Sequence, residues 1–370
     1  MPKIVLEHVT KKFQKFTAVE DLNMVIEDRE FIILLGPSGC GKTTTLRMIA
    51  GLETPTEGRI TIGDTVVFDS EKKINLSPAK RDIGFLFQNY ALWPHMTVHQ
   101  NIAFGLENLK WPKAKIEERV KEMLQMLKIE EFDKRYPAEL SGGQQQRVAI
   151  ARTLAPKPKV LFMDEPLSNL DAKLRLEMRI ELKRLHTDTD STFIYVTHDQ
   201  LEAMTLSSKI CLIKNGYLQQ FDPPMETYSN PANLFVADFV GNPSMNFIDA
   251  KCLSAKGKGA ELEFFGRKFE FKSVKAIEGM SSDQVVVGVR PEFVHLETGD
   301  IKGKIYGTLP AGMETTVKLD IDGYIFTSVK FGSVDYKLNS DMNFSIEGDG
   351  IILFDKESGK NIGKGSVVAC

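Results

Sequence analysis

The chain has 370 residues, more than one hydrophobic core usually supports, so two domains are expected. Hydrophobic residues make up 42% and charged residues 26%, as in an ordinary globular protein. The net charge of −3 argues against a dedicated nucleic-acid binder, which normally carries a basic excess. The sequence contains no signal-peptide pattern and no apolar run as long as about eighteen residues, so neither secretion nor a membrane-spanning helix is expected.

The four cysteines favour free thiols over a disulfide framework or a metal site. Cys211, Cys252 and Cys370 are scattered without metal-ligand spacing, and Cys40 lies in a glycine-rich loop that a disulfide would distort. Free thiols are typical of a reducing compartment, so cysteine usage favours the cytoplasm.

Three short strands are expected ahead of that loop, at Ile4–Val9, Met24–Ile26 and Phe31–Leu35. The polar stretch between the first two carries Phe13 and Phe16. An exposed aromatic ring close to a nucleotide could stack on its base, whereas a buried ring would pack beneath a small sheet. The residues alone leave both interpretations open.

The glycine-rich loop Gly36–Thr43 reads GPSGCGKT and matches the pattern G-x-x-x-x-G-K-[ST] in full. Its glycines let backbone N–H groups surround a phosphate, and the helix that follows directs its positive dipole end at the same anion. Lys42 supplies a cation for the β- and γ-phosphates, and the Thr43 hydroxyl is placed to bind Mg²⁺. A glycine-rich turn without a ligand would not need the full pattern between a strand and a helix. The sequence therefore predicts a nucleoside triphosphate site.

A largely helical insert is expected further along the chain. Ile83–Phe87 reads as a strand that ends at Gln88, and an aromatic, turn-rich segment follows it. The segment leads to Lys113–Lys128, where apolar residues recur at helical spacing. Two hairpins are also predicted, at Thr56–Phe68 and at Lys209–Phe221, the second with an Asn-Gly turn.

A second anion-binding pattern lies at Leu140–Gln144, which reads LSGGQ and runs into a helix at Gln145–Ala155. Ser141 offers a hydroxyl, and Gly142 and Gly143 expose backbone N–H groups at the helix N-terminus. The motif contains neither lysine nor carboxylate, so it suits a phosphate held by another part of the assembly. The alternative is an ordinary capped helix.

Two further strands end in chemically useful residues. Val160–Met163 ends in Asp164, which could hold Mg²⁺ through water, and in Glu165, which could act as general base toward an attacking water. Phe193–Thr197 ends at His198. A lone histidine is usually a surface residue, but beside a strand that carries Glu165 it becomes a candidate contact for the γ-phosphate.

Taken in order, these motifs resemble those of the ATP-binding cassette (ABC) ATPases over roughly the first 235 residues. The resemblance implies an α/β, P-loop NTPase fold: a RecA-like core with a helical subdomain at about 89–158, within a nucleotide-binding domain at 1–235. The matching segments are the phosphate loop, the Q-loop, the signature, the strand VLFMDEP, the D-loop and the switch histidine, at Gly36–Thr43, Gln88, Leu140–Gln144, Val160–Pro166, Ser168–Asp171 and His198.

The resemblance also implies roles for individual residues. Glu165 would polarise the attacking water, His198 would sense the γ-phosphate, and Gln88 would complete the catalytic set. Mg²⁺ would be bound by Thr43, with Gln88 and Asp164 close by. Contacts to ATP are implied for Phe13, Gly36, Pro37, Ser38, Gly39, Cys40, Gly41, Lys42, Thr43, Thr44, Ser141, Gly142, Gly143, Gln144 and Asp171.

The family further implies an assembly. Two cassettes pack head to tail, and the signature of one closes over the ATP of the other. The chain has one phosphate loop and one signature, so a homodimer with an isologous interface is expected. Transmembrane permease subunits, and indirectly an extracellular solute-binding protein, are the other partners implied. The chain would then lie at the cytoplasmic face of the cell membrane as a peripheral subunit.

Residues 236–370 are expected to form a small β-rich domain. GNPSMNF at Gly241–Phe247 and GVRPE at Gly288–Glu292 resemble importer ATPases of the carbohydrate-uptake branch, of the maltose-transporter type, whose C-terminal domain is OB-like and regulatory. A nucleic-acid-binding barrel is the alternative, but acidic residues are frequent and no basic–aromatic stripe is visible. The predicted strands are Glu261–Phe265, Phe269–Phe271, Val285–Val289, Tyr324–Val329 and Ile351–Phe354.

The resemblance implies uptake of a sugar or oligosaccharide. Importers of polyamines, iron or inorganic anions are the nearest alternative, and a soluble ABC ATPase acting on nucleic acid is more distant. The segment Phe85–Asn101 would receive a helix of a permease, with Tyr90 and Trp93 lining the groove. The other interpretation is that these two aromatic residues pack within the helical subdomain.

Overall fold

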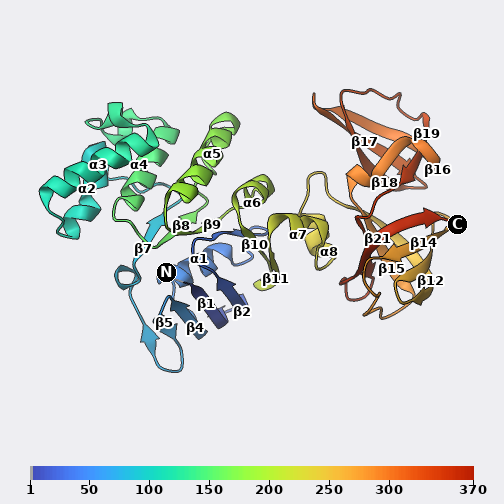
Figure 1. Cartoon of the computed structure of the whole chain (residues 1–370), viewed down its shortest axis with the longest axis horizontal. Helices are drawn as coiled ribbons and strands as arrows, with labels where there is room; N and C mark the ends of the chain where they lie inside the picture. The colour runs from blue at the N-terminus through green and yellow to red at the C-terminus, as the bar shows by residue number, and fades with distance from the viewer. Residues whose placement is uncertain (1–2) are drawn as a thin grey trace. The chain divides into compact units, whose positions relative to one another are not determined.

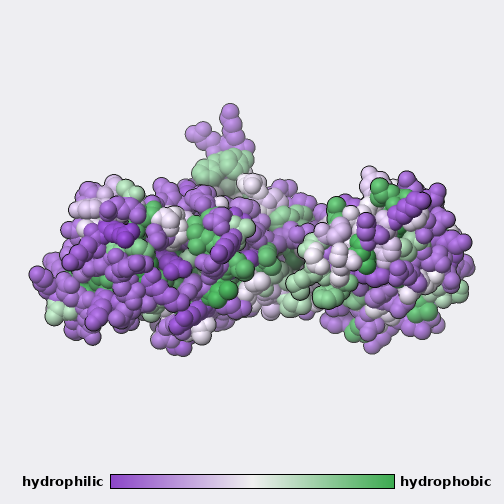
Figure 2. Space-filling model, turned by 90° about the horizontal axis from the view of Figure 1, so that it is seen from above, coloured by the Kyte–Doolittle hydropathy of each residue, from purple (hydrophilic) through white to green (hydrophobic). Residues whose placement is uncertain are grey.

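The computed structural model describes residues 3–370. The chain divides into two compact units, with the boundary between Pro224 and Met225. Each unit has its own sheets (Figure 1). Each also has its own hydrophobic core. The expected domain boundary at 235/236 stays a prediction. On the face in Figure 2, hydrophilic side chains predominate on both units.

The centre of the first unit is a six-stranded sheet in the order β11-β10-β3-β9-β8-β7, parallel except for β11. Every residue of β3, β8 and β9 is buried, as expected for parallel strands covered on both faces. The strands are β3 (Phe31–Leu35), β7 (Ile83–Leu86), β8 (Val160–Asp164), β9 (Thr192–Val196), β10 (Lys209–Lys214) and β11 (Tyr217–Asp222).

Helices follow three of these strands: α1 (Lys42–Ala50) after β3, α5 (Ala172–Asp188) after β8 and α6 (Gln200–Leu206) after β9. Three more form the insert between β7 and β8 and group together in Figure 1: α2 (Val98–Asn108), α3 (Lys113–Leu127) and α4 (Gly142–Leu154). The expected helical insert is therefore present between two neighbouring strands of the main sheet.

A second sheet of the first unit is antiparallel, in the order β2-β1-β4-β5-β6. Phe13 and Phe16 were expected in a polar stretch between two strands, and this expectation is wrong. Phe13 ends β1, Phe16 begins β2, and the two residues pair with each other. Register shifts interrupt the β1–β2 ladder, so polar and apolar residues do not alternate cleanly. The strands are β1 (Ile4–Phe13), β2 (Phe16–Ile26), β4 (Glu57–Ile62), β5 (Thr65–Asp69) and β6 (Ile74–Asn75).

Both predicted hairpins are confirmed. Strands β4 and β5 pair up to Ile62 and Thr65, and β10 and β11 pair up to Lys214 and Tyr217. In the second hairpin the central residues have positive φ angles, 50° and 84°, as a type I′ turn requires.

The second unit begins with two short helices, α7 (Pro224–Ser229) and α8 (Leu234–Phe239), and continues with ten strands. Six of them close into a barrel, β12-β13-β14-β21-β20-β15, and four form the sheet β18-β17-β16-β19. The strands are β12 (Asn246–Lys256), β13 (Gly259–Phe264), β14 (Arg267–Ser273), β15 (Gln284–Val289), β16 (Val294–Pro310), β17 (Glu314–Ile321), β18 (Tyr324–Phe331), β19 (Asp341–Ile346), β20 (Ile351–Asp355) and β21 (Asn361–Ala369).

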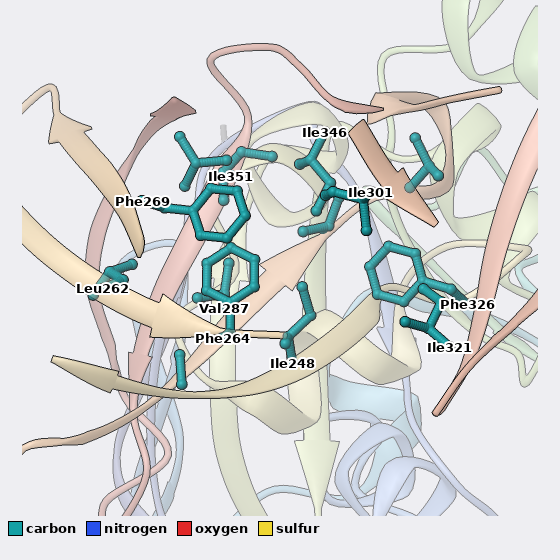
Figure 3. Close-up of a cluster of buried hydrophobic side chains, with 14 of the residues drawn as sticks. Ile248, Leu262, Phe264, Phe269, Val287, Ile301, Ile321, Phe326, Ile346 and Ile351 are labelled. Carbon is teal, nitrogen blue, oxygen red and sulfur yellow. The ribbon is translucent and has the colours of Figure 1, made fainter. Parts of the chain in front are cut away.

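One continuous core joins the barrel to the four-stranded sheet (Figure 3). On the barrel side the rings of Phe264 and Phe269 stack with their centroids 3.9 Å apart. On the sheet side Phe326 packs with Ile301 and Ile321. The expected β-rich second domain is confirmed as a barrel extended by a sheet.

The two sequence motifs of the second unit meet at a buried arginine. Arg290 of GVRPE is 1% exposed and donates to the backbone carbonyls of Ala237, Val240 and Tyr228. Gly241 of GNPSMNF lies so close that a Cβ there would be 2.6 Å from the Arg290 guanidinium. The motifs therefore secure the end of α8 to the barrel.

Candidate nucleotide site

The phosphate loop connects the buried strand β3 to the helix α1, and two of its glycines cannot carry a side chain. Gly41 has φ 108°, and a Cβ there would lie 2.4 Å from the carbonyl oxygen of Ala18. At Gly36 a Cβ would lie 2.2 Å from the carbonyl oxygen of Ile213. The loop is therefore pressed against neighbouring backbone, with its N–H groups at the N-terminus of α1.

Lys42 is only 5% exposed, and its ammonium group bridges the loop that carries it. Its Nζ donates to the carbonyl oxygens of Gly36 and Pro37, each at 2.8 Å. This holds the positive charge against two backbone carbonyl groups of the loop, where it is well placed to meet an anionic group.

The thiol of Cys40 shares this enclosed environment. It is 3.9 Å from Lys42 Nζ, and burial raises its pKa even though the nearby ammonium acts in the opposite direction. Cys211 and Cys252 are buried as well, and burial raises their pKa values, whereas Cys370 is exposed. All four are free thiols.

Only one thiol should therefore react quickly in the folded protein, because the thiolate is the nucleophile and must be accessible. A chromogenic disulfide reagent is expected to modify Cys370 rapidly and the other three thiols only after denaturation. The Cys370→Ser variant should lose the rapid phase. A rapid phase that persists in this variant and maps to Cys40 would contradict the enclosed loop.

Asp164, at the end of β8, is the buried carboxylate beside the loop. Its Oδ1 accepts a hydrogen bond from Thr43 Oγ1 at 3.1 Å, and its Oδ2 lies 3.4 Å from Arg47 Nη2. These hard oxygen donors suit Mg²⁺, which usually takes one or two protein ligands and completes its shell with phosphate and water. Among residues 3–370, no group of three or more His, Cys, Asp and Glu residues is placed to hold a metal. The donors present therefore fit a magnesium ion that arrives with a phosphate group.

Glu165 has an unusual backbone conformation for a non-glycine residue, with φ 45° directly after a strand. Its N–H donates to the carbonyl oxygen of Val196, and its carbonyl accepts from Ser168 Oγ at 2.8 Å. Its Oε2 lies 3.5 Å from Nδ1 of His198. Such conformations occur at functional sites when the surrounding structure holds them in place.

Gln88 joins the same group through Ser168 and Asn169. Its Nε2 donates to Ser168 Oγ at 3.4 Å, and its backbone carbonyl accepts from Asn169 Nδ2 at 3.2 Å. Because Ser168 also contacts Glu165, the structure brings Gln88, Glu165 and His198 together next to the Thr43–Asp164 pair. This edge of the sheet can bind a triphosphate and direct a base at a water molecule.

The signature residues form a capping box at the start of α4. Ser141 Oγ accepts from the Gln144 N–H at 3.4 Å, and Gln144 Oε1 accepts from the Ser141 N–H at 2.8 Å. Gly143 is buried rather than open, because a Cβ there would lie 2.5 Å from Leu174 of α5. No hydrogen bond or ion pair seen within residues 3–370 joins Ser141–Gln144 to the phosphate loop. Asp171 caps α5 by accepting from the Leu174 N–H, as its sequence position suggests.

The structure decides between the alternatives that the sequence left open for the aromatic residues. Phe13 is 38% exposed and stacks on Phe16, with Lys11 Nζ 4.7 Å above its ring. Tyr90 is only 6% exposed, which agrees with the alternative that it packs within the helical subdomain and not with exposure in a groove. Trp93 does line a cavity of about 420 Å³, together with Phe104.

Sequence reasoning missed Arg175, Asp199 and Glu202, which surround the His198 segment. Arg175 donates to the carbonyl oxygen of Leu170 at 3.0 Å and lies 3.7 Å from Asp199. The buried Glu202 carboxylate accepts from the hydroxyl groups of Tyr195 and Thr197, and burial raises its pKa. The acidic residues shortly after His198 were the only visible signal.

Comparisons with known proteins agree with this geometry. The family model of the ABC transporter matches residues 19–168, and the model of the MalK OB fold domain matches 241–294. A solved dimeric ATP-binding cassette, in a post-hydrolysis state bound to ADP and Pi, has 33% identity and a TM-score of 0.52. The alignment covers 60% of this chain and 98% of the chain of that cassette.

Curated relatives match nearly the whole chain. The trehalose/maltose import ATP-binding protein MalK of Thermococcus litoralis is 44% identical over 374 residues, covering 98% of this chain and 100% of the relative. The oligosaccharides import ATP-binding protein MsmX of Bacillus subtilis is 41% identical over 368 residues, covering 97% and 99%. None of the helices within residues 3–370 is long and apolar enough to cross a membrane. The chain therefore belongs to the nucleotide-binding ATPases of the ABC transporter family.

Proposed function

We propose that the chain is the ATP-hydrolysing subunit of an ABC importer for a sugar or oligosaccharide. The observation that carries the proposal is the convergence of Gln88, Glu165 and His198 beside the Thr43–Asp164 pair. A binding module without hydrolysis would not need a glutamate whose backbone is held in the left-handed region and whose carboxylate lies next to a histidine.

Each residue has a defined part in this proposal. Lys42 and the N–H groups of the loop bind the phosphates, and Glu165 accepts a proton from the attacking water. His198 contacts the γ-phosphate and orients Glu165, from which it lies 3.5 Å. Thr43 and Asp164 would hold Mg²⁺, with Gln88 nearby, and the ion would neutralise charge on the β- and γ-phosphates.

On this proposal, a complete ATP site requires a second copy of the chain. The signature N-terminus at Ser141–Gln144 has its own cap but no hydrogen bond or ion pair to the phosphate loop within residues 3–370. A head-to-tail homodimer would bring the signature of one protomer to the ATP of the other, together with Asp171. The related cassette of known structure is a dimer bound to ADP and Pi, which supports this arrangement.

Sugar import is supported by the names of the relatives and by the second unit. MalK and MsmX are named for import of trehalose or maltose and of oligosaccharides, and both align over nearly all of this chain. The match to the MalK OB fold domain supports the same branch. Permease subunits would dock at the mostly apolar cavity lined by Trp93 and Phe104. As the ATPase subunit of an importer, the chain would lie at the cytoplasmic face of the membrane.

The proposal is tested by co-expressing the chain with candidate permeases and purifying it from membranes. We expect it to co-purify with transmembrane subunits and to hydrolyse ATP faster in proteoliposomes when a sugar-loaded solute-binding protein is added. Stimulation by a polyamine, iron or an inorganic anion in place of sugar would reassign the cargo. ATP hydrolysis stimulated by nucleic acid, without a membrane partner, would overturn the importer assignment.

A further inference from the structure

The turn that follows Gln88 contains two consecutive residues in the left-handed region. Tyr90 has φ 60° and Ala91 has φ 48°. Neither is glycine, and a side chain makes this conformation unfavourable at each position. The turn therefore depends on contacts from outside itself.

Arg152, on α4, makes those contacts. Its Nη2 donates to the carbonyl oxygen of Tyr90 at 2.8 Å, and its Nη1 donates to the carbonyl oxygen of Ala91 at 2.6 Å. The guanidinium also lies 4.8 Å from the centre of the Trp93 ring. A rigid, planar fork can bind two successive carbonyl groups in one orientation, which a lysine ammonium cannot reproduce.

This contact connects two parts of the site that are distant in sequence. Tyr90 comes shortly after Gln88, whose side chain reaches Ser168 and whose carbonyl accepts from Asn169. Arg152 is near the C-terminal end of the helix that begins directly after Ser141. The same side chain therefore connects the C-terminal end of α4 to the turn that follows Gln88.

We propose that Arg152 is a positioning residue that holds the Tyr90–Ala91 turn in its left-handed conformation and so sets Gln88 for catalysis. Arg152 acts through the backbone of the turn and contacts no nucleotide. The inference rests on the proposed function, because it concerns the efficiency of ATP hydrolysis.

A purely structural arginine on a neighbouring helix provides a matched control. Arg119 of α3 is 8% exposed and donates to the carbonyl oxygens of Leu154 and Ala155 at the end of α4. Like Arg152, it satisfies two backbone carbonyls with its guanidinium. No hydrogen bond or ion pair seen within residues 3–370 joins it to the Gln88 turn, so Arg119→Ala should affect stability without affecting Gln88.

The experiment uses the full chain and measures kcat for ATP hydrolysis, the Kd of a fluorescent ATP analogue and the melting temperature. We expect Arg152→Ala to lower kcat about tenfold, since small misplacements of catalytic groups are costly, while the Kd changes by less than about twofold. Arg152→Lys should resemble Arg152→Ala. Arg119→Ala should lower the melting temperature and leave kcat, measured below the transition, near wild type.

A second substitution distinguishes positioning from general destabilisation. Glycine adopts positive φ without a steric penalty, so Ala91→Gly in the Arg152→Ala background should recover at least about threefold in kcat. An unchanged kcat in Arg152→Ala would overturn the inference while leaving the proposed function intact. So would a parallel loss of kcat, Kd and melting temperature without recovery by Ala91→Gly. A wild-type chain that does not hydrolyse ATP would instead overturn the proposed function, and this inference with it.

Discussion

Replacing Glu165 by glutamine should lower kcat for ATP hydrolysis by about 10²–10⁴-fold, the usual contribution of a general base. The amide keeps the size of the side chain and its proximity to His198 but cannot take a proton from water. The backbone of Glu165 is held by Val196 and Ser168, so the substitution should leave the strand end in place. ATP affinity should change only slightly, because the phosphate loop is untouched.

Single-turnover hydrolysis and equilibrium titration with ATP measure these two quantities separately. Glu118→Gln is the matched control, because Glu118 is an exposed residue of α3 outside the site. It should behave as wild type in both assays. Turnover of Glu165→Gln near the wild-type rate would show that another group is the base.

Replacing Lys42 by alanine should raise the Kd for ATP by about 10²–10³-fold, because it removes charge-assisted bonds to phosphate from an enclosed site. Lys42 is 5% exposed, and its ammonium group lies 2.8 Å from two carbonyl oxygens of its own loop. The loss should appear in binding itself and not only in turnover.

An equilibrium titration with and without Mg²⁺ tests this expectation. Lys121→Ala removes an equal charge from the exposed face of α3 and should leave the Kd unchanged. A Kd for Lys42→Ala within a few-fold of wild type would mean that the backbone N–H groups alone bind the triphosphate. The thermal unfolding of both variants separates loss of binding from loss of structure.

Local patterns were enough to predict the framework of the first unit. The buried strands of the main sheet carry apolar runs, and Asn215 and Gly216 form the residue pair preferred in a two-residue hairpin turn. Parallel strands end at one edge of a sheet, so Thr43 and Asp164, 121 positions apart, could be expected to meet there. The same reasoning extends to Glu165 and His198.

What could not be predicted depends on pairings between distant segments. The ladder of β1 and β2 contains register shifts, which hide the alternation that identifies strands. Strand β16 runs from Val294 to Pro310 and changes partner position along β19 and β17, so no single period describes it. For Tyr90 the sequence left exposure in a groove and packing within the helical subdomain both open, and its burial became visible only in the fold.

Within the site, the missed contacts are made by long side chains that reach across elements. Arg152 reaches the Tyr90–Ala91 turn, and Arg175 reaches both Leu170 and Asp199. Neither arginine belongs to a glycine-rich or strand-end pattern. Gly143 fits its motif, but its packing against Leu174 is visible only in three dimensions.

The insert of helices α2–α4 is joined to the sheet at two points, the end of β7 and the start of β8, which are parallel neighbours. The covalent chain therefore allows the insert to turn about the line through these two joints, whereas the packing of Gly143 against Leu174 of α5 opposes such a turn. Arg152 and Ser141 lie about 16 Å apart along α4, so a tilt of the helix by about 5° about Arg152 would displace Ser141 by roughly 1.4 Å. A displacement of that size makes or breaks a hydrogen bond. A tilt of a few degrees is therefore enough to make or break a hydrogen bond at Ser141, the end of the insert farthest from Arg152 along α4.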